Sequence, residues 1–240
     1  LLDVYYPENP NGYGVIHISG SGWARPLGLD AKMLNHQSHV TIEGRALVEA
    51  GYTVFSVNHR ATPRFTYPAA VEDVQRAVRF IRYHADKYKI RPDRIGAVGG
   101  SSGGHLVCML GALDGKGSSE GDSPINKVSS KVQCVVARAA PTVFYEGAIG
   151  SSFLGTGRNA IKDEATIEGR LATEASPLTH VSEDDPPFLF LHGDQDDIVP
   201  FSMSEKMEVA LKALGIPTKL VRVEGAGHGP SFPGATSKID

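Results

Sequence analysis

Two adjacent serines stand in a glycine-rich turn between a strand-like apolar run and a helix-like run. The segment reads RIGAVGGSSGGHLVCMLGAL over residues 94–113. A serine on a sharp strand-to-helix turn needs very small residues two positions before and after it, because larger side chains would clash with the strained backbone. The spacing G-x-S-x-G is met twice, once around Ser101 and once around Ser102. Spacing alone therefore leaves both serines as candidate nucleophiles.

A serine hydroxyl attacks efficiently only when a neighbouring base takes its proton and an acid orients that base. Candidates for both roles follow later in the chain. The strand-like run in PPFLFLHGDQDDIVP ends in a turn that holds Asp194, Asp196 and Asp197, and His228 stands in EGAGHGPS directly after the last strand-like run. Three crowded carboxylates repel one another unless one finds a cation or a hydrogen-bond donor. The order serine, aspartate, histidine is one of those known for hydrolytic triads.

Each of these segments also has a simpler interpretation. The glycine-rich turn could be flexible or could cradle a phosphate, although the G-x-x-x-x-G-K-[S/T] and G-x-G-x-x-G spacings are absent. The acidic turn could be solvated or form part of a cation site, although it lacks the EF-hand pattern. His228 could be an ordinary surface-loop histidine. No metal or organic cofactor is implied, because the other histidines lack the H-E-x-x-H spacing of zinc ligands.

Most of the nine histidines are expected to be structural. Four of them lie in or beside predicted strands or the helix after the serines, namely His17, His59, His105 and His192. We expect at least three of these four to serve the scaffold.

At these residues the chain resembles the α/β-hydrolase-fold esterases, in the branch of hormone-sensitive-lipase-like and small carbohydrate and feruloyl esterases. The corresponding segments there read G-x-S-[A/S]-G-G-H-L and H-G-x-x-D-x-x-V-P. The resemblance implies that Ser101 is the nucleophile and that the Ser102 N–H lies in the oxyanion hole. It also implies that Asp196 is the orienting acid and His228 the base. It extends over residues 1–229.

The oxyanion loop departs from the pattern of these esterases. They carry H-G-G-G-W, whereas this chain carries SGSGW over residues 19–23. We expect the N–H groups of Ser21 and Gly22 to complete the oxyanion hole, because backbone donors aimed at the developing charge lower the barrier. Trp23 is expected to pack behind this loop more readily than to stack on a substrate. The candidates for contact with the substrate are Trp23, Phe144, Tyr145 and Phe153.

Apolar β-rich runs alternate with helical patterns, which predicts a mainly parallel sheet with helices on both faces. The strand-like runs are LLDVYY, GVIHIS, YTVFSVN, RIGAVG, VQCVVAR, PFLFLH and TKLVRV. Helical spacing follows Pro68, at Val71, Val74, Val78 and Ile81. The resemblance implies the α/β-hydrolase fold, a three-layer sandwich with a mostly parallel central sheet of about eight strands.

The chain is predicted to form one domain over residues 1–240, with a probable cap-like insertion at about 141–180. Two stretches break the alternation of strands and helices, at residues 114–130 and 141–180. Long irregular segments in compact domains are often lids or binding loops. We therefore interpret residues 141–180 as a small cap over the site.

Composition excludes several classes of protein. The 24 Lys and Arg against 27 Asp and Glu give a net charge of -3, which argues against nucleic-acid binding by bulk charge. No apolar run reaches the roughly 18–20 residues of a membrane span. Cys108 and Cys134 lie in apolar runs and are expected to be inert buried thiols. Because the chain begins at Leu1 inside a strand-like run, we expect the natural start to be missing. Localisation and oligomeric state are not predicted.

The predicted function is that of a serine carboxylic ester hydrolase whose partner is a small-molecule ester. The resemblance implies short-chain acyl esters or acetyl and feruloyl esters of carbohydrates. Two alternatives remain open. One is an amidase or peptidase with the same triad, and the other is a catalytically silent binding protein on the same fold.

Overall fold

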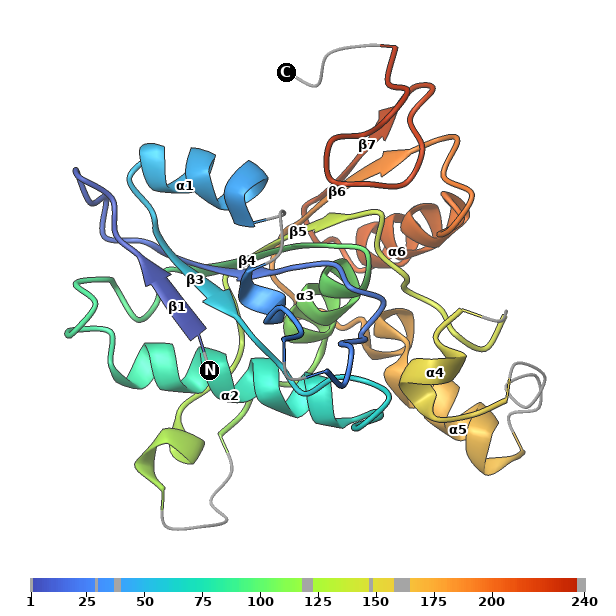
Figure 1. The fold of residues 1–240 in the computed structure, drawn as a ribbon, viewed down its shortest axis with the longest axis horizontal. Coiled ribbons are helices and arrows are strands. Elements are labelled where there is room, and N and C mark those ends of the chain that lie inside the picture. Colours follow the sequence, from blue (N-terminus) through green and yellow to red (C-terminus); the bar gives the residue numbers. More distant parts are fainter. Residues whose placement is uncertain are drawn as a thin grey trace.

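The computed structural model describes residues 2–28, 30–36, 40–117, 123–146, 149–157 and 165–236. A seven-stranded sheet in the order β1-β3-β2-β4-β5-β6-β7 runs through the described part of the chain (Figure 1). Its strands are β1 (Leu2–Tyr5), β2 (Gly14–Ile18), β3 (Thr53–Val57), β4 (Ile95–Gly100), β5 (Cys134–Arg138), β6 (Phe188–Gly193) and β7 (Thr218–Val223).

Only β1 pairs antiparallel, with β3, and every other pairing in the sheet is parallel. The mostly parallel sheet is therefore confirmed. The expected count of about eight strands is one too many for the described residues, which hold seven. Each observed strand corresponds to one of the seven β-rich runs in the sequence, so the resemblance and not the sequence pattern supplied the extra strand.

Six α-helices occur in the described residues: α1 (Arg45–Glu49), α2 (Ala69–Tyr83), α3 (Ser102–Ala112), α4 (Ser151–Leu154), α5 (Ile167–Ala175) and α6 (Ser202–Ala213). The helical spacing after Pro68 is confirmed, because Val71, Val74, Val78 and Ile81 are all buried in α2. Every residue of α3 is buried. A helix that is apolar all round belongs in the interior, and α3 packs there against β4 and β5.

The helices cover both faces of the sheet. Helices α2, α3 and α6 contribute Val74, Leu106 and Met207 to one continuous hydrophobic core that also includes strand residues such as Ile16. Helix α1 lies on the other side of the sheet from α2 and α3 (Figure 1). A smaller apolar cluster forms around Phe232 after β7. This layering leaves the carboxyl ends of the parallel strands free to carry a site.

The segment predicted as a cap packs into the core where the structure describes it. Phe153 of α4 and Ala172 and Ala175 of α5 belong to the main hydrophobic cluster. Residues 147–148 and 158–164 of this segment lie outside the described residues. Its covering role therefore stays a prediction. Of the two cysteines expected in the core, Cys108 is buried whereas Cys134 is exposed at the first position of β5.

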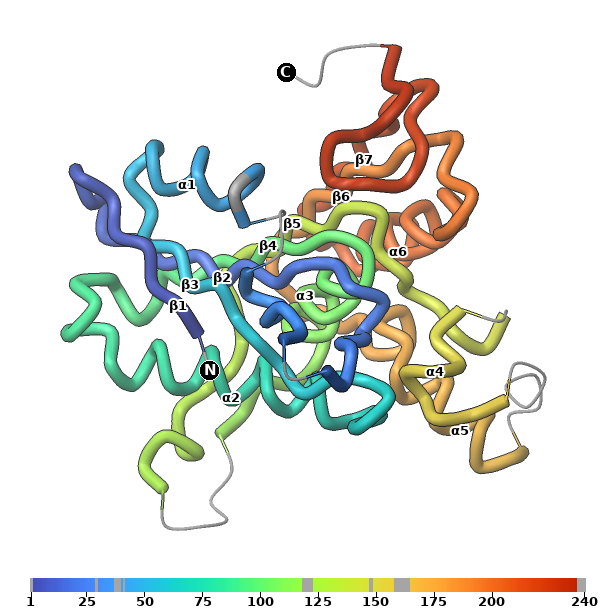
Figure 2. Tube along the Cα trace, viewed as in Figure 1, coloured from blue at the N-terminus to red at the C-terminus, as the bar shows by residue number. Residues whose placement is uncertain are grey.

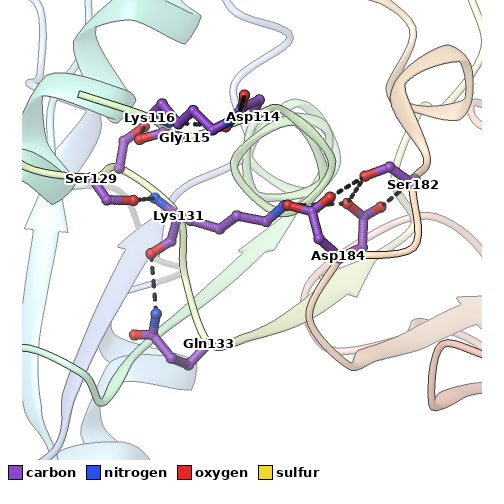
Figure 3. A network of polar contacts seen from close by, with 10 residues as sticks. Asp114, Gly115, Lys116, Ser129, Lys131, Gln133, Ser182 and Asp184 are labelled. Atoms are coloured by element: carbon purple, nitrogen blue, oxygen red, sulfur yellow. Dashed lines mark hydrogen bonds and ion pairs between the residues drawn. The ribbon is translucent and has the colours of Figure 1, made fainter. Parts of the chain in front are cut away.

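An ionic network lies at the amino ends of the parallel strands, opposite to the predicted site (Figure 3). Lys131, which precedes β5, places its Nζ 2.7 Å from an oxygen of Asp184, which precedes β6. The Ser182 hydroxyl donates to another oxygen of Asp184 at 2.6 Å. These contacts tie together the amino ends of two neighbouring parallel strands.

The predicted site residues gather at the other edge, where the parallel strands end. Ser101 follows β4, Asp196 follows β6, and His228 follows β7. Figure 2 shows the trace after β7 folding back in a loop beside β6. The sheet topology therefore brings together residues that are far apart in the sequence.

Candidate active site

Ser101 forms the turn between β4 and α3 in a backbone conformation that favours glycine. Its φ is 53° and its ψ is −125°. Such conformations cost roughly 1–3 kcal/mol and persist where the surrounding structure enforces them. Here the Ser101 N–H donates to the Arg138 carbonyl at 2.8 Å, and the Ser101 carbonyl accepts from the His105 N–H at 2.9 Å. The turn is thus held from both sides with the Ser101 hydroxyl at the edge of the sheet.

The two glycines that flank Ser101 lie too close to backbone to carry a side chain. A Cβ on Gly99 would lie 2.5 Å from the Gly103 carbonyl oxygen, and a Cβ on Gly103 would lie 2.0 Å from the Ile18 carbonyl oxygen. These distances are far inside van der Waals contact. The close approach of α3 to β2 therefore requires glycine two residues before and two residues after Ser101.

The structure brings Ser101, His228 and Asp196 into one line of hydrogen bonds. Ser101 Oγ lies 3.0 Å from His228 Nε2, and His228 Nδ1 lies 2.8 Å from Asp196 Oδ2. The other candidate serine, Ser102, is fully buried, and its Oγ accepts a hydrogen bond from the Ser21 N–H at 2.8 Å. Of the two serines, Ser101 is the one that faces the histidine.

Asp196 is surrounded by donors although its side chain is fully buried. Its Oδ1 accepts from the N–H groups of Ile198 at 3.0 Å and Val199 at 2.8 Å. Its Oδ2 lies 3.3 Å from Nε2 of His192 in addition to its bond with His228. Burial by itself raises the pKa of Asp196, but these hydrogen bonds outweigh it and hold the pKa well below its usual range. The carboxylate is therefore ionised at neutral pH.

His192 contacts Asp196 from within the buried interior. Its ring is fully buried, with Nδ1 2.7 Å from Ser204 Oγ and Nε2 3.0 Å from the Val199 carbonyl oxygen. Because a carbonyl only accepts, Nε2 carries the proton, and Nδ1 accepts from the Ser204 hydroxyl. Sequence reasoning placed His192 in the scaffold and missed this contact with Asp196. The available signal was its position four residues before Asp196.

A cavity of about 240 Å³ opens beside Ser101. Its lining residues are Gly20, Ser21, Gly100, Ser101, Arg138, Ala139, His228, Gly229 and Pro230. Ser21 lies in this lining, whereas Gly22 does not. The Ser21 N–H, one of the predicted oxyanion donors, is engaged by the Ser102 hydroxyl. The roles of Ser21, Gly22 and Ser102 in an oxyanion hole thus stay predictions.

The aromatic residues predicted to touch a substrate pack mainly with one another behind the oxyanion loop. Trp23 is 6% exposed, and its ring stacks on Phe153 with the centroids 4.8 Å apart. Phe144 makes an edge contact with Trp23. Tyr145 is half-buried and packs against the same core. None of the four residues is in the lining of the cavity beside Ser101.

His105 completes this aromatic cluster. The Trp23 Nε1–H donates to His105 Nδ1 at 3.0 Å, so His105 Nε2 carries the ring proton and donates to the Ala175 carbonyl at 2.8 Å. Burial lowers the pKa of His105 to about 4, and the ring is neutral at pH 7. The histidine connects the oxyanion loop to the end of α5.

Sequence reasoning also missed a buried arginine at the site. Arg138 ends β5, lines the cavity, and is only 8% exposed. Its guanidinium pairs with the Glu43 carboxylate and donates to the Pro230 carbonyl, the latter at 2.6 Å. Burial lowers the pKa of Arg138 to about 10, so its charge persists at neutral pH. The signal in the sequence was a lone charge at the end of the apolar run VQCVVAR.

No group of three or more His, Cys, Asp or Glu in the described part of the chain is arranged to hold a metal ion. No described helix is long and apolar enough to cross a bilayer.

The fold agrees with the comparisons to known proteins. Residues 2–211 match the model of the family described as BD-FAE. The chain belongs to the BD-FAE family. A truncated form of a carbohydrate esterase from gut microbiota superposes with a TM-score of 0.79 and 28% identity, over 95% of this chain and 84% of that one. This BD-FAE chain therefore has the α/β-hydrolase fold, as the resemblance implied.

Two further relatives carry names that describe ester hydrolysis. The acetyl ester-xyloside bifunctional hydrolase from Caldicellulosiruptor lactoaceticus has a TM-score of 0.79 and 26% identity, over 95% of this chain and 78% of that one. The probable carboxylic ester hydrolase LipM of Mycobacterium tuberculosis is 34% identical over 157 residues, which are 64% of this chain and 36% of LipM. The chain spans about half or less of the length of the first curated relatives it matches.

Proposed function

We propose that this BD-FAE chain is a serine carboxylic ester hydrolase with Ser101 as nucleophile, His228 as general base and Asp196 as the orienting acid. One observation carries the proposal. The hydroxyl on a strained strand-to-helix turn, the histidine and the buried carboxylate form a continuous line of hydrogen bonds at the mouth of a cavity. The names of the relatives support the same reaction class.

In the first step, His228 Nε2 accepts the proton of Ser101 as Oγ forms a bond to the carbonyl carbon of the ester. The electron pair of the C=O bond moves to its oxygen, which becomes an oxyanion. When that pair returns, the bond to the alcohol oxygen breaks, and the alcohol leaves with the proton from His228. Asp196 holds Nδ1 and stabilises the positive charge that the ring carries in between.

In the second step, a water molecule takes the place of the alcohol. His228 Nε2 accepts a proton from this water as its oxygen attacks the acyl carbon attached to Ser101. The bond to Ser101 Oγ breaks, the proton returns to the serine, and the carboxylic acid departs. The enzyme is regenerated without a change of oxidation state at any atom.

The proposed oxyanion hole consists of the Ser102 N–H, at the amino end of α3, and the N–H groups of the loop that holds Ser21 and Gly22. The amino end of a helix favours negative charge, and backbone donors of this kind typically supply roughly 2.7–4 kcal/mol. In the structure the Ser21 N–H donates to Ser102 Oγ. A substrate oxygen must therefore share that N–H with the Ser102 hydroxyl or displace the hydroxyl from it.

The cavity beside Ser101 has room for a short acyl group. About 240 Å³ beside Ser101 accommodates an acetyl or similarly small group. Acetyl and related esters of carbohydrates fit this size and match the names of the neighbouring structures, which include an acetyl ester hydrolase and a carbohydrate esterase.

Active-site labelling with a fluorophosphonate, followed by peptide mapping, tests the proposal. We expect modification of Ser101 that disappears in Ser101→Ala and in His228→Ala. The matched control is Ser102→Ala, the same substitution at the adjacent serine, in which labelling of Ser101 should persist. Labelling at Ser102 would show that Ser102, and not Ser101, is the nucleophile. Folded protein that neither labels nor hydrolyses a p-nitrophenyl ester would show a silent binding protein instead.

A further inference from the structure

A second cavity, of about 470 Å³, lies at the same edge of the sheet. It forms between the segment after Trp23 and the segment after β3. The residues that line it are Arg25, Pro26, Leu27, Gly28, Asn58, His59, Arg60, Ala61, Arg64, Phe65 and Asp73. None of these residues belongs to the proposed triad or to its cavity.

The sheet sets the distance between the two cavities. Strand β3, whose following residues line the second cavity, pairs with β2, and β2 pairs with β4, which leads into Ser101. Because neighbouring strands lie about 4.8 Å apart, the ends of β3 and β4 are roughly 10 Å from each other. The two segments that form the second cavity are joined directly, since the Thr62 N–H donates to the Trp23 carbonyl at 2.8 Å. Two adjacent units of one chain-like substrate could span this separation.

The second cavity carries an excess of positive charge on a chain whose net charge is -3. Of its three arginines, Arg60 is paired with Asp73 and Glu72. Arg25 donates only to the carbonyls of Ala31 and Lys32, and Arg64 is exposed. Within the described residues neither Arg25 nor Arg64 forms an ion pair with a carboxylate. The exposed Arg64 guanidinium is therefore available to bind an anionic ligand in a bidentate manner, whereas Nε and one terminal nitrogen of Arg25 already donate to carbonyl oxygens.

A buried histidine forms part of the wall. His59 is 4% exposed, and its Nδ1 lies 2.7 Å from the Arg60 carbonyl oxygen, so Nδ1 carries the ring proton. Burial lowers the pKa of His59, which keeps the ring neutral at pH 7. The histidine therefore adds no charge to the arginines of the cavity.

Two exposed apolar side chains complete the walls. Leu27 is 70% exposed and Phe65 is 41% exposed. Large apolar side chains beside a few polar groups in a concave site are typical of ligand pockets. The lining therefore offers positive charge, the free guanidinium group of Arg64 and an apolar surface.

We propose that the second cavity binds a sugar unit bearing a carboxylate, a hexuronate, next to the sugar whose ester is cleaved at Ser101. Arg64 binds the carboxylate, Arg25 adds positive charge beside it, and Phe65 packs against the apolar face of the ring. The inference deepens the proposed esterase function by naming acidic oligosaccharides as its substrate class. It rests on that function only for the reaction at Ser101, because binding can be measured without turnover.

Binding is measured on Ser101→Ala, titrated with sodium glucuronate and with glucose by chemical-shift mapping. We expect glucuronate to bind at least ten-fold more tightly than glucose, with shifts at residues 58–65. Arg64→Gln in the same background should weaken glucuronate binding about ten-fold. The matched control is Arg94→Gln, which removes an equal charge just before β4, at the opposite edge of the sheet. Equal affinity for the two sugars overturns the proposal, and sulfate binding as tightly as glucuronate would reduce the site to an unspecific anion patch.

Measurement of turnover is a second test of the proposal. The protein should hydrolyse an acetylated xylo-oligosaccharide bearing a glucuronate at least five-fold faster, by kcat/KM, than the same oligosaccharide without it. This ratio should fall to near one in Arg64→Gln and stay unchanged in Arg94→Gln. Turnover without any preference contradicts the acidic subsite alone. Absence of turnover and of fluorophosphonate labelling contradicts the esterase function, while the titration with glucuronate still decides the subsite.

Discussion

Two buried polar clusters flank Ser101, and they are satisfied to different degrees. The aspartate network consists of His228, Asp196, His192 and Ser204, and each of these side chains has a hydrogen-bond partner. The arginine cluster consists of Arg138, Glu43 and His17. In this cluster His17 Nδ1 and Arg138 Nε are buried without a hydrogen bond to the described residues, and His17 Nε2 has only a contact of 3.3 Å with Glu43 Oε2 among them.

The difference indicates that the two clusters have different roles, one in proton transfer and the other in holding chain segments together. Proton transfer needs one fixed tautomer and one fixed ring orientation, and the aspartate network defines both for His228. The arginine cluster instead connects chain segments. The Arg138 carbonyl accepts from the Ser101 N–H, and its guanidinium holds the Pro230 carbonyl two residues after His228. We therefore expect substitutions in the first cluster to change the rate mainly, and those in the second to change stability mainly.

Asp196→Asn should have the largest effect on the rate. An amide at this position presents an N–H group to His228 Nδ1 and favours the wrong tautomer, so kcat should fall about 10³–10⁴-fold. The measurement is hydrolysis of a short p-nitrophenyl ester, with urea unfolding to separate any change in stability from the change in rate. Asp197→Asn is the matched control. Asp197 is adjacent to Asp196 in sequence but is exposed, so this variant should keep nearly full activity. Equal losses in both variants would remove Asp196 from the mechanism.

Arg138→Met should have the largest effect on stability. The Glu43 side chain is 10% exposed and would keep a buried charge without its arginine. Removing one partner of a buried ion pair typically costs about 3–5 kcal/mol, so the free energy of unfolding in urea should fall by that amount. The double variant Arg138→Met with Glu43→Gln should recover at least half of this loss. A double variant as unstable as the single one would show that the pair is not coupled.

The sequence predicted the elements and the proposed triad but not the arginine cluster. Continuous apolar runs such as VQCVVAR identified buried parallel strands, and the parallel topology then placed Ser101, Asp196 and His228 at one edge. Those three residues stand in loops whose glycine and strand contexts are local. Strand order brings these loops together, but the choice of Ser101 over Ser102, and of Asp196 over its neighbouring aspartates, came from the resemblance to known esterases.

Arg138 and Glu43 have no local signature. Glu43 lies in a π-helical turn, Val40–Gly44, and meets Arg138 across 95 positions of sequence. Such a pairing depends on how the turn Val40–Gly44 and the end of β5 pack in three dimensions. The aromatic candidates show the same limit, because Phe144 and Phe153 are aromatic residues near the site in sequence but bury themselves against Trp23. Residue type and proximity in the chain cannot distinguish a pocket wall from the core behind it.

Acid should destabilise the protein through its buried histidines. Burial, and then the nearby Arg138 charge, lower the pKa of His17 to about 4, and burial lowers that of His105 to about 4. Between pH 6.5 and pH 4 the unfolded chain binds protons that the native state does not. The free energy of unfolding is therefore highest above pH 6.5 and falls by about 3 kcal/mol per histidine as the pH drops to 4.

Urea unfolding at pH 7, 6 and 5 measures this dependence. His17→Gln should reduce the slope of unfolding free energy against pH by about one proton, whatever its effect on absolute stability. If His17→Gln keeps the full slope, the arginine cluster does not hold a neutral histidine.

His192→Phe should have the smallest effect and marks how far the aspartate network extends. Phe fills a similar volume but removes the contact to Asp196 Oδ2, while Asp196 keeps its bonds from Ile198, Val199 and His228. We expect kcat to fall about ten-fold with KM nearly unchanged, because a residue that supports a catalytic group acts on the chemical step. Lys131→Met, in the ionic network at the opposite edge (Figure 3), should leave kcat unchanged. A His192→Phe variant with the full rate would show that the residues beyond Asp196 do not affect catalysis. His192 and Ser204 would then contribute mainly to stability, as expected for the arginine cluster.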